Sequence, residues 1–231
     1  MSDFKKYLED LINLFYPKLC AACGNYLYRQ EEFVCTHCLF HLPKTNYYLL
    51  PDNPVAQIFW GRISIKVAAS YFEFHKGSKF QKLLHKMKYQ NQKEIGWVLG
   101  KHFGLQLKES PLFQEIDQII PVPLHPSRER KRGYNQAEWI AKGIAESMNV
   151  YLNSKNLYRS VNTSTQTRKN RLERWKNVEN IFRLKNPDEL INKHILLVDD
   201  VVTTGSTLEA CAHALLQVDG VCVSIATLSH A

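Results

Sequence analysis

The fold is decided by one stretch, Ile195-Leu196-Leu197-Val198-Asp199-Asp200-Val201-Val202-Thr203-Thr204-Gly205-Ser206-Thr207. Its first four residues are apolar and branched, which predicts a strand buried on both faces, as in a parallel sheet. Two carboxylates follow where such a strand would end, and apolar residues then recur at helical spacing from Leu208 to Leu216. Ligands of open α/β sheets bind beyond the carboxyl ends of the strands. The stretch therefore predicts a ligand site between a strand and a helix.

The loop after the acids suits a phosphate. A tight loop that enters a helix directs backbone N–H groups and a positive dipole end at an anion, and Gly205 permits a turn or a close approach that a Cβ would hinder. Asp199 and Asp200 suit a sugar diol, or a Mg²⁺ ion that accompanies a diphosphate. The lysine of a P-loop is missing, which disfavours ATPase chemistry. The simpler alternative is an acidic turn before an N-capped helix. Four loop side chains carry hydroxyl groups that could donate to phosphate oxygens: Thr203, Thr204, Ser206 and Thr207.

The segment from Val198 to Thr207 resembles the 5-phosphoribosyl-1-pyrophosphate (PRPP) motif of type I phosphoribosyltransferases. The resemblance implies that Asp199 and Asp200 hold the ribose hydroxyls and are the candidate catalytic residues. It also implies that the loop from Thr203 to Thr207 binds the 5′-phosphate and that Val202 belongs to the PRPP site.

Length and composition fit a soluble globular protein. The chain has 231 residues, of which 45% are hydrophobic and 23% are charged, which allows one large domain or a main domain with a small one. No run approaches the ~18 apolar residues of a membrane span. Residues 1–18 predict an amphipathic helix rather than a signal peptide, because acids interrupt its apolar positions. We therefore expect a cytoplasmic protein.

The net charge of +8 is concentrated in two segments. Residues 159–185 hold eight Lys and Arg against two Glu, and residues 125–134 hold four against one. Such patches attract phosphates, nucleic acid or another anionic ligand. The polar run 163–176 predicts a mobile loop that closes on an anion, with Arg168 and Arg171 as candidate contacts.

Four cysteines form the pattern C-x₂-C-x₁₁-C-x₂-C: Cys20, Cys23, Cys35 and Cys38. This spacing predicts a structural Zn²⁺ with four thiolate ligands. Two disulfides or a redox-active pair are the alternatives; disulfides would need an oxidising compartment. Short strands around 26–28 and 32–34 could complete a zinc ribbon. Cys211 and Cys222 lie in apolar segments and are expected in the core.

We expect three parts: an N-terminal helix and zinc-ribbon module at 1–45, a turn-rich linker at 46–62, and an α/β domain at 63–231. Within the last part, residues 63–113 could form a hood over a nucleotide site and residues 114–231 the core. Alternating apolar residues predict a strand from Ile63 to Tyr71. Helical spacing predicts helices at 80–87 and 95–107, whose lysines are most simply a solvated face.

Residues 115–120 predict a second buried strand, followed by a proline-rich loop and a helix at 137–148. This unit and the one at 195–217 predict parallel βα units of one sheet, whose loops converge at one edge. The loop after 120 would hold the pyrophosphate; its candidate contacts are Pro123, Leu124, Arg128 and Arg132. Further strands are expected around 157–159 and 221–228.

The chain resembles members of the ComF family, because several of its segments occur in the order that this family shows. These segments are the paired cysteine knuckles, Lys88-Tyr89, Pro121-Val122-Pro123-Leu124-His125-Pro126, Arg132-Gly133-Tyr134-Asn135-Gln136-Ala137, Thr165-Gln166-Thr167-Arg168, Arg171, Asn177-Val178 and the motif at 198–207. The resemblance implies a zinc ribbon joined to a type I phosphoribosyltransferase-like domain, a mostly parallel sheet flanked by helices. It implies PRPP or nucleotide binding with Mg²⁺, and a role in DNA uptake and natural transformation that handles imported single-stranded DNA.

Three functions remain open at this point. The chain could be an enzyme that displaces pyrophosphate from PRPP, with Arg128, Arg132 and Arg168 on the leaving group. It could be a PRPP- or nucleotide-binding accessory protein that contacts single-stranded DNA without turnover. It could be an interaction module whose zinc ribbon docks a helicase or a recombination-mediator protein.

Overall fold

A parallel sheet forms the centre of the molecule, in a computed structural model that describes residues 15–160 and 181–231. Its five strands lie in the order β1-β7-β6-β2-β3 and every neighbouring pair is parallel. All carboxyl ends therefore meet at one edge. The strands are β1 (Ala68–Glu73), β2 (Gln118–Pro121), β3 (Tyr151–Leu152), β6 (His194–Val202) and β7 (Cys222–His230).

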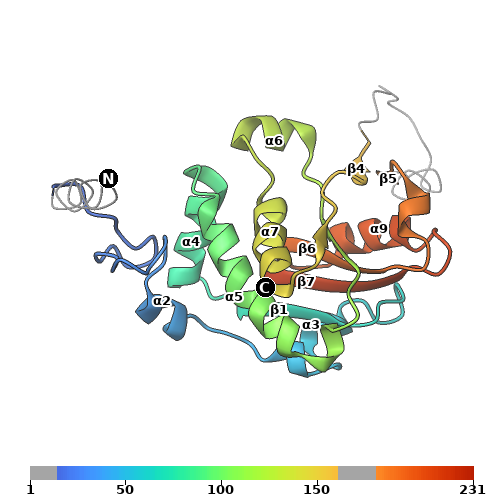
Figure 1. Cartoon of the computed structure of the whole chain (residues 1–231), viewed down its shortest axis with the longest axis horizontal. Helices are drawn as coiled ribbons and strands as arrows, with labels where there is room; N and C mark the ends of the chain where they lie inside the picture. Colours follow the sequence, from blue (N-terminus) through green and yellow to red (C-terminus); the bar gives the residue numbers. More distant parts are fainter. Residues whose placement is uncertain (1–14, 161–180) are drawn as a thin grey trace, which may run out of the picture.

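Helices cover both faces of the sheet (Figure 1). One face carries α4 (Lys79–Tyr89), α5 (Glu94–Glu109) and α7 (Gln136–Met148), and the other carries α3 (Pro54–Gln57) and α9 (Ser206–Leu215). Alternation along β6 serves both layers: Leu196 and Val198 face the first, and Ile195 and Leu197 face the second. An uninterrupted apolar strand is what two covered faces require.

Glycines bring α5 and α7 into backbone contact. A Cβ on Gly100 would lie 2.3 Å from the carbonyl oxygen of Ile140, and one on Gly143 would lie 2.1 Å from that of Trp97. Only glycine permits this approach. The two helices thus pack as one unit over the sheet.

Shorter elements join these layers. Three 3₁₀ turns lie at η1 (Tyr47–Leu49), η2 (Pro111–Phe113) and η3 (Pro187–Leu190), and a small helix α2 (Thr36–His41) follows the third cysteine of the cluster. A further helix, α6 (Pro126–Arg132), stands clear of the two layers in Figure 1. β4 (Leu157–Arg159) and β5 (Phe182–Leu184) pair antiparallel as a separate ribbon.

The expected helices at 80–87, 95–107 and 137–148 are confirmed, as is the parallel arrangement of the two βα units. The first strand begins at Ala68 and not at Ile63, because its pairing with β7 starts at Ala68↔Ile225. The expectation that β6 ends before its acids is also wrong. Pairing with β7 continues through Asp199↔Thr227 to Val202↔His230, which keeps both acids on the strand.

Residues 63–113, which we expected to form a hood over a nucleotide site, contribute to the main sheet and to its core. β1 is a strand of the main sheet, and the buried residues of α4 and α5 belong to the same core as those of α7. The end of α4 brings Lys88 to Asp200 at the carboxyl edge.

The segment 46–62 is packed rather than extended. Val55, Ala56 and Phe59 are buried in the core under α9. Asn53 is also buried; its Oδ1 accepts bonds from the first turn of α3, and its Nδ2 donates to the carbonyls of Tyr47, Leu50 and Ala68. Five satisfied hydrogen bonds of this kind fix a chain segment in place.

The expectation that both Cys211 and Cys222 lie in the core is only half correct. Cys211 is buried as expected, but Cys222 is exposed, because it opens β7 at the sheet's opposite edge. Most of the expected helix at 1–18 and all of the loop at 163–176 lie outside the described residues. Within 15–160 and 181–231, no helix has the length and apolar character needed to cross a membrane.

Candidate functional site

Two adjoining cavities open at the carboxyl edge of the sheet. The larger, about 210 Å³, lies between the end of β6, the end of α4 and the segment 122–137. The smaller, about 60 Å³, is lined by Asp199 and residues 201–208. Asp199, Val201 and Thr207 line both cavities. One ligand could therefore span them.

The cavities bring together every described residue that the sequence proposed for the ligand. Arg168 and Arg171 lie outside the described part of the chain. The larger cavity adds five polar side chains beyond the predicted contacts: Lys88, His125, Asn135, Gln136 and Arg159. The proposed residues that line the larger cavity are Pro123, Leu124, Arg128, Arg132, Asp199, Asp200 and Thr207, and those that line the smaller are Asp199, Val202, Thr203, Thr204, Gly205, Ser206 and Thr207.

The loop 203–207 has the geometry of an anion site. Gly205 has φ +75°, a left-handed conformation that favours glycine, and it is the N-cap of α9 without a side-chain capping bond. The N–H groups of the first helical turn are therefore left for a ligand. The hydroxyls of Thr204 and Ser206, which both line the smaller cavity, lie 3.0 Å apart.

Residues from the segment 46–62 support this loop from below. A Cβ on Gly205 would lie 2.7 Å from Cγ2 of Ile58 and 2.9 Å from Cε1 of Phe59. Arg62 donates through Nη1 to the carbonyls of Ile58 (3.1 Å) and Thr204 (2.7 Å), and Nη2 donates to the Glu209 carboxylate in the first turn of α9. Arg62 therefore holds the loop and neutralises an acid near its anion site.

The acid pair has unequal members. Asp199 accepts a bond of 2.8 Å from the N–H of Asp200, and the Asp200 carboxylate lies 2.8 Å from Nζ of Lys88. Burial and the charge of Asp200 raise the pKa of Asp199 to about 8, although the N–H bond and Lys88 act in the opposite direction. In the free protein Asp199 is thus protonated at neutral pH, while Asp200 is paired with a lysine.

A hydrogen bond to the neighbouring residue Met87 fixes the position of Lys88. The buried Tyr134 hydroxyl donates to the carbonyl of Met87, next to Lys88 at the end of α4. Helical spacing favours a solvated face for the lysines of this helix, and only the family segment Lys88-Tyr89 distinguishes Lys88 from the others. Periodicity does not distinguish Lys88 from its neighbours, because they share one face of one helix.

The opposite wall is basic and held by side-chain bonds. Asn135 caps α7 and donates to the carbonyl of Val122 at 2.9 Å, and Arg132 donates to Oε1 of Gln136 at 2.7 Å. Arg159 enters the cavity from β4, with its guanidinium 5.5 Å from the ring of Phe182. The cavity therefore has an acidic floor and cationic sides.

This donor set fits Mg²⁺ only together with a phosphate ligand. Magnesium is commonly held by one or two carboxylates and completed by substrate phosphates and water. Asp200, and Asp199 once it has lost its proton, would supply those carboxylates, and the surrounding cations would bind the remaining phosphate oxygens.

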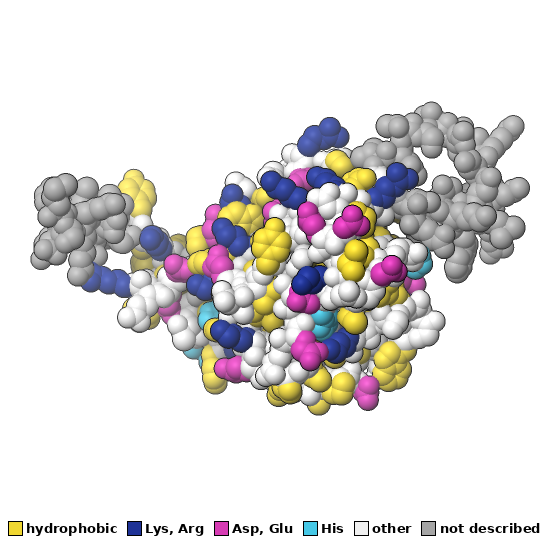
Figure 2. Space-filling model, turned by 45° about the vertical axis from the view of Figure 1, so that its right-hand side comes forward, with side chains coloured by type: hydrophobic (Ala, Val, Ile, Leu, Met, Phe, Trp, Pro, Cys, Tyr) yellow, Lys and Arg dark blue, Asp and Glu magenta, His cyan; other side chains and the backbone are white. Residues whose placement is uncertain are grey.

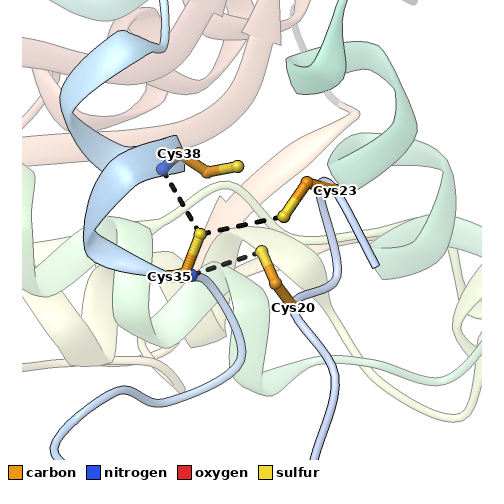
Figure 3. A group of neighbouring side chains, drawn as sticks. All are labelled: Cys20, Cys23, Cys35 and Cys38. Atoms are coloured by element: carbon orange, nitrogen blue, oxygen red, sulfur yellow. Dashed lines mark hydrogen bonds between the residues drawn. The ribbon is translucent and has the colours of Figure 1, made fainter. Parts of the chain in front are cut away.

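The second candidate site is the cysteine cluster, whose side chains point toward one another (Figure 3). All four sulfur atoms lie within 4.8 Å of one another, and Sγ of Cys23 and Cys35 are 3.8 Å apart. Tetrahedral coordination with Zn–S bonds of about 2.3 Å places sulfurs about 3.8 Å apart. The cluster could therefore hold a metal ion such as zinc.

Backbone donors favour the thiolate of Cys20, whereas burial raises the pKa of Cys35 and of Cys38. Cys35 N–H donates to Sγ of Cys20 at 3.3 Å, and Cys38 N–H donates to Sγ of Cys35 at 3.4 Å. Burial raises the pKa of Cys20, but N–H groups led by that of Cys35 outweigh burial and lower the pKa to about 7. A thiol that ionises this readily suits metal binding.

The strands expected around 26–28 and 32–34 are not formed. The module has one antiparallel bridge, Leu19↔Tyr26, and turns elsewhere before α2. Short backbone bonds such as Cys20 N to Asn25 O (2.7 Å) and Ala21 N to Phe33 O (2.8 Å) take the place of a ladder. Its buried residues join the core on the α4–α5 side.

Comparison with known proteins agrees with this geometry. A family model described as phosphoribosyl transferase domain matches residues 110–230, which is more than half of the chain and defines the class of fold. A Salmonella typhimurium protein named DNA utilization protein YhgH is 32% identical over 207 residues, covering 86% of this chain and 84% of its own. The chain therefore belongs to the ComF family and carries a phosphoribosyl transferase domain.

Two further relatives carry related names. The Shigella flexneri DNA utilization protein YhgH is 29% identical over 207 residues, covering 86% of this chain and 84% of its own. Competence protein F of Haemophilus influenzae is 33% identical over 138 residues, covering 58% of this chain and 60% of its own.

Proposed function

We propose that the two cavities bind PRPP or a related nucleotide with Mg²⁺, and that the protein acts in DNA uptake or utilisation by handling imported single-stranded DNA. The observation that carries the proposal is the meeting of an acid pair, an uncapped helix start and basic side chains in one continuous site. The names of the relatives support the DNA role.

Each part of the ligand has a matching part of the site. Asp199 and Asp200 would take the ribose hydroxyls and Mg²⁺. The loop from Val202 to Thr207 would take the 5′-phosphate through backbone N–H groups and hydroxyls. Pro123 and Leu124 would border the pyrophosphate, with Lys88, Arg128 and Arg132 as its cations; Arg168 and Arg171 remain proposed partners from the undescribed segment.

Calorimetry with Mg²⁺ and PRPP tests this function. The wild-type protein is expected to bind, and the double variant Asp199→Asn, Asp200→Asn is expected to lose binding. Asp188→Asn, an exposed acid outside the cavities, is the matched control and should bind like wild type. Unchanged affinity in the double variant would remove PRPP from this site.

Turnover of PRPP is the second candidate, favoured by the raised pKa of Asp199. In that reaction the acceptor's lone pair forms a bond to C1′ while the C1′–O bond breaks, and its electron pair leaves with pyrophosphate. A carboxyl with a pKa of about 8 can exchange a proton near neutral pH, so Asp199 could take the acceptor's proton once its own has left. Release of pyrophosphate across a panel of amines and nucleobases would test this step. Loss of release in Asp199→Asn would assign it where calorimetry shows that the variant still binds PRPP.

A further inference from the structure

Helix α6 is not explained by packing. None of its seven residues is buried, and it is nevertheless capped at both ends, by the ring of His125 at its start and by Gly133, with φ +79°, at its end. Four of the seven residues are cations: Arg128, Arg130, Lys131 and Arg132. A helix that buries nothing gains no stability from the core, so its value lies in the charges that it displays. Figure 2 shows Lys and Arg side chains gathered along the upper edge of the molecule, where Figure 1 places α6.

A cavity of about 560 Å³ lies between α6 and the end of α4. Among the described residues, its lining consists of Lys88, Tyr89, Asn91, Arg128, Lys131 and Arg132. Four of these side chains are cations and none is a carboxylate. Lys88 is paired with Asp200. No carboxylate of the described chain lies within ion-pair distance of Arg128, Lys131 or Arg132. Three uncompensated cations facing one cavity fit an anionic ligand.

An exposed aromatic ring stands in the same cavity. Tyr89 is 64% exposed, and its ring lies 4.9 Å from the ring of His85 and 5.7 Å from the guanidinium of Arg132. Such an arrangement orients a ring without covering it. Nucleobases stack on aromatic rings and on guanidinium planes, so the ligand has a flat ring as well as negative charge.

We infer that this cavity binds a nucleotide unit, with the base against Tyr89 and Arg132 and the phosphate on Arg128 and Lys131. The cavity shares Lys88, Arg128 and Arg132 with the larger cavity described above, so its occupant would lie beside the ribose-phosphate site and not inside it. The unit could come from a free nucleotide or from a DNA strand. The choice of DNA as one source rests on the proposed function, whereas the site itself does not depend on PRPP binding.

Fluorescence anisotropy with a labelled twelve-nucleotide oligo-dT, and calorimetry with dTMP, test the inference on the full chain. Tyr89→Ala is expected to weaken binding about tenfold through lost stacking, and Tyr89→Phe should bind like wild type. Lys131→Ala should lower the slope of log affinity against log salt by about 1 for the oligonucleotide. Tyr151→Ala removes another exposed tyrosine, outside the cavity, and should change neither measurement.

The results distinguish a DNA strand from a free nucleotide as the source of the nucleotide unit. Affinity that rises with strand length identifies a DNA strand, and equal affinity for dTMP and longer strands identifies a free nucleotide. Absence of binding by both probes, or equal binding by Tyr89→Ala and wild type, would overturn the inference. PRPP titrations of the same Tyr89→Ala sample show whether the neighbouring site is intact, so that failure there is distinguished from failure here.

Discussion

Nη1 of Arg62 donates a hydrogen bond of 2.7 Å to the carbonyl of Thr204, a residue 142 positions later in the chain. The same guanidinium reaches Glu209 in the first turn of α9. The loop 203–207 is therefore held from outside by a residue that precedes the first strand of the sheet.

Arg62→Ala should weaken Mg²⁺–PRPP binding by about tenfold, because hydrogen bonds that involve a charged group contribute roughly 1.5–3 kcal/mol and the loop would lose its orientation. Calorimetry at constant salt measures the change. Arg62→Lys keeps the charge without the forked geometry and should be intermediate. Glu209→Gln, which leaves the Thr204 bond in place, should bind at least as well as wild type. Wild-type affinity in Arg62→Ala would show that the loop needs no support.

Asp199 should make the free protein less stable as pH rises. Its folded pKa of about 8 lies above its ordinary value of 3.8, so between these values the folded state binds more protons and the free energy of unfolding falls with increasing pH. Asp199→Asn removes this term. Its stability advantage over wild type should grow between pH 4 and pH 8 by at least about 1 kcal/mol, the value of a single pKa unit.

Urea unfolding at several pH values checks this difference. Asp188→Asn is the control, since that acid is exposed, and its curve should run parallel to that of wild type. A constant gap between Asp199→Asn and wild type across the pH range would contradict a raised pKa.

The cysteine cluster should carry about one zinc ion per chain, as expected for four thiolate ligands. Cys38→Ser should lose the metal and lower the melting temperature, because binding free energy at a structural site is also folding free energy. Metal analysis with thermal melts in the presence and absence of a chelator gives both readouts. Cys222→Ser, at an exposed cysteine far from the cluster in the chain, should keep its metal. Full metal content in Cys38→Ser would exclude four-cysteine coordination.

Gly100→Ala should destabilise the protein by about 1–3 kcal/mol or more, because overpacking a close contact forces backbone shifts. Its Cβ would lie 2.3 Å from the carbonyl oxygen of Ile140. Helix propensity alone predicts the opposite sign, since alanine is favoured over glycine in a helix. Chemical denaturation measures the change, and Leu105→Ala, at an exposed position on the same helix, should cost far less. A stabilised Gly100→Ala would mean that α5 and α7 separate easily.

Local patterns predicted the parts of the fold that local physics determines. The strand and loop at 195–207 were predicted because a doubly buried strand and a helix start both have sequence signals. The three long helices follow from apolar spacing, and their positions agree with the structure to within a few residues. The described members of the predicted site share two cavities because parallel strands place their carboxyl ends together.

Long-range contacts were not predictable in this way. The contact of Arg62 with Thr204 and that of Lys88 with Asp200 join segments with no common period or motif. The turn-rich composition of 46–62 suggested a linker, although Asn53 and Phe59 are buried there. Helix α6 was assigned to a loop, since it has no apolar stripe by which periodicity could reveal it. PRPP, Mg²⁺, DNA and a protein partner of the cysteine module stay predictions.

The strand order has a consequence for the timing of synthesis. β7 follows every other described strand in sequence, yet it lies between β1 and β6 within the sheet. On the ribosome, β1 and β6 must wait without their shared neighbour until residues 222–230 have emerged, and unpaired strand edges are prone to aggregation. Because β7 pairs with β6 at Asp199, the acid pair also acquires its final setting at that moment. A chain that ends before residue 222 should therefore not bind the ligand proposed for this site.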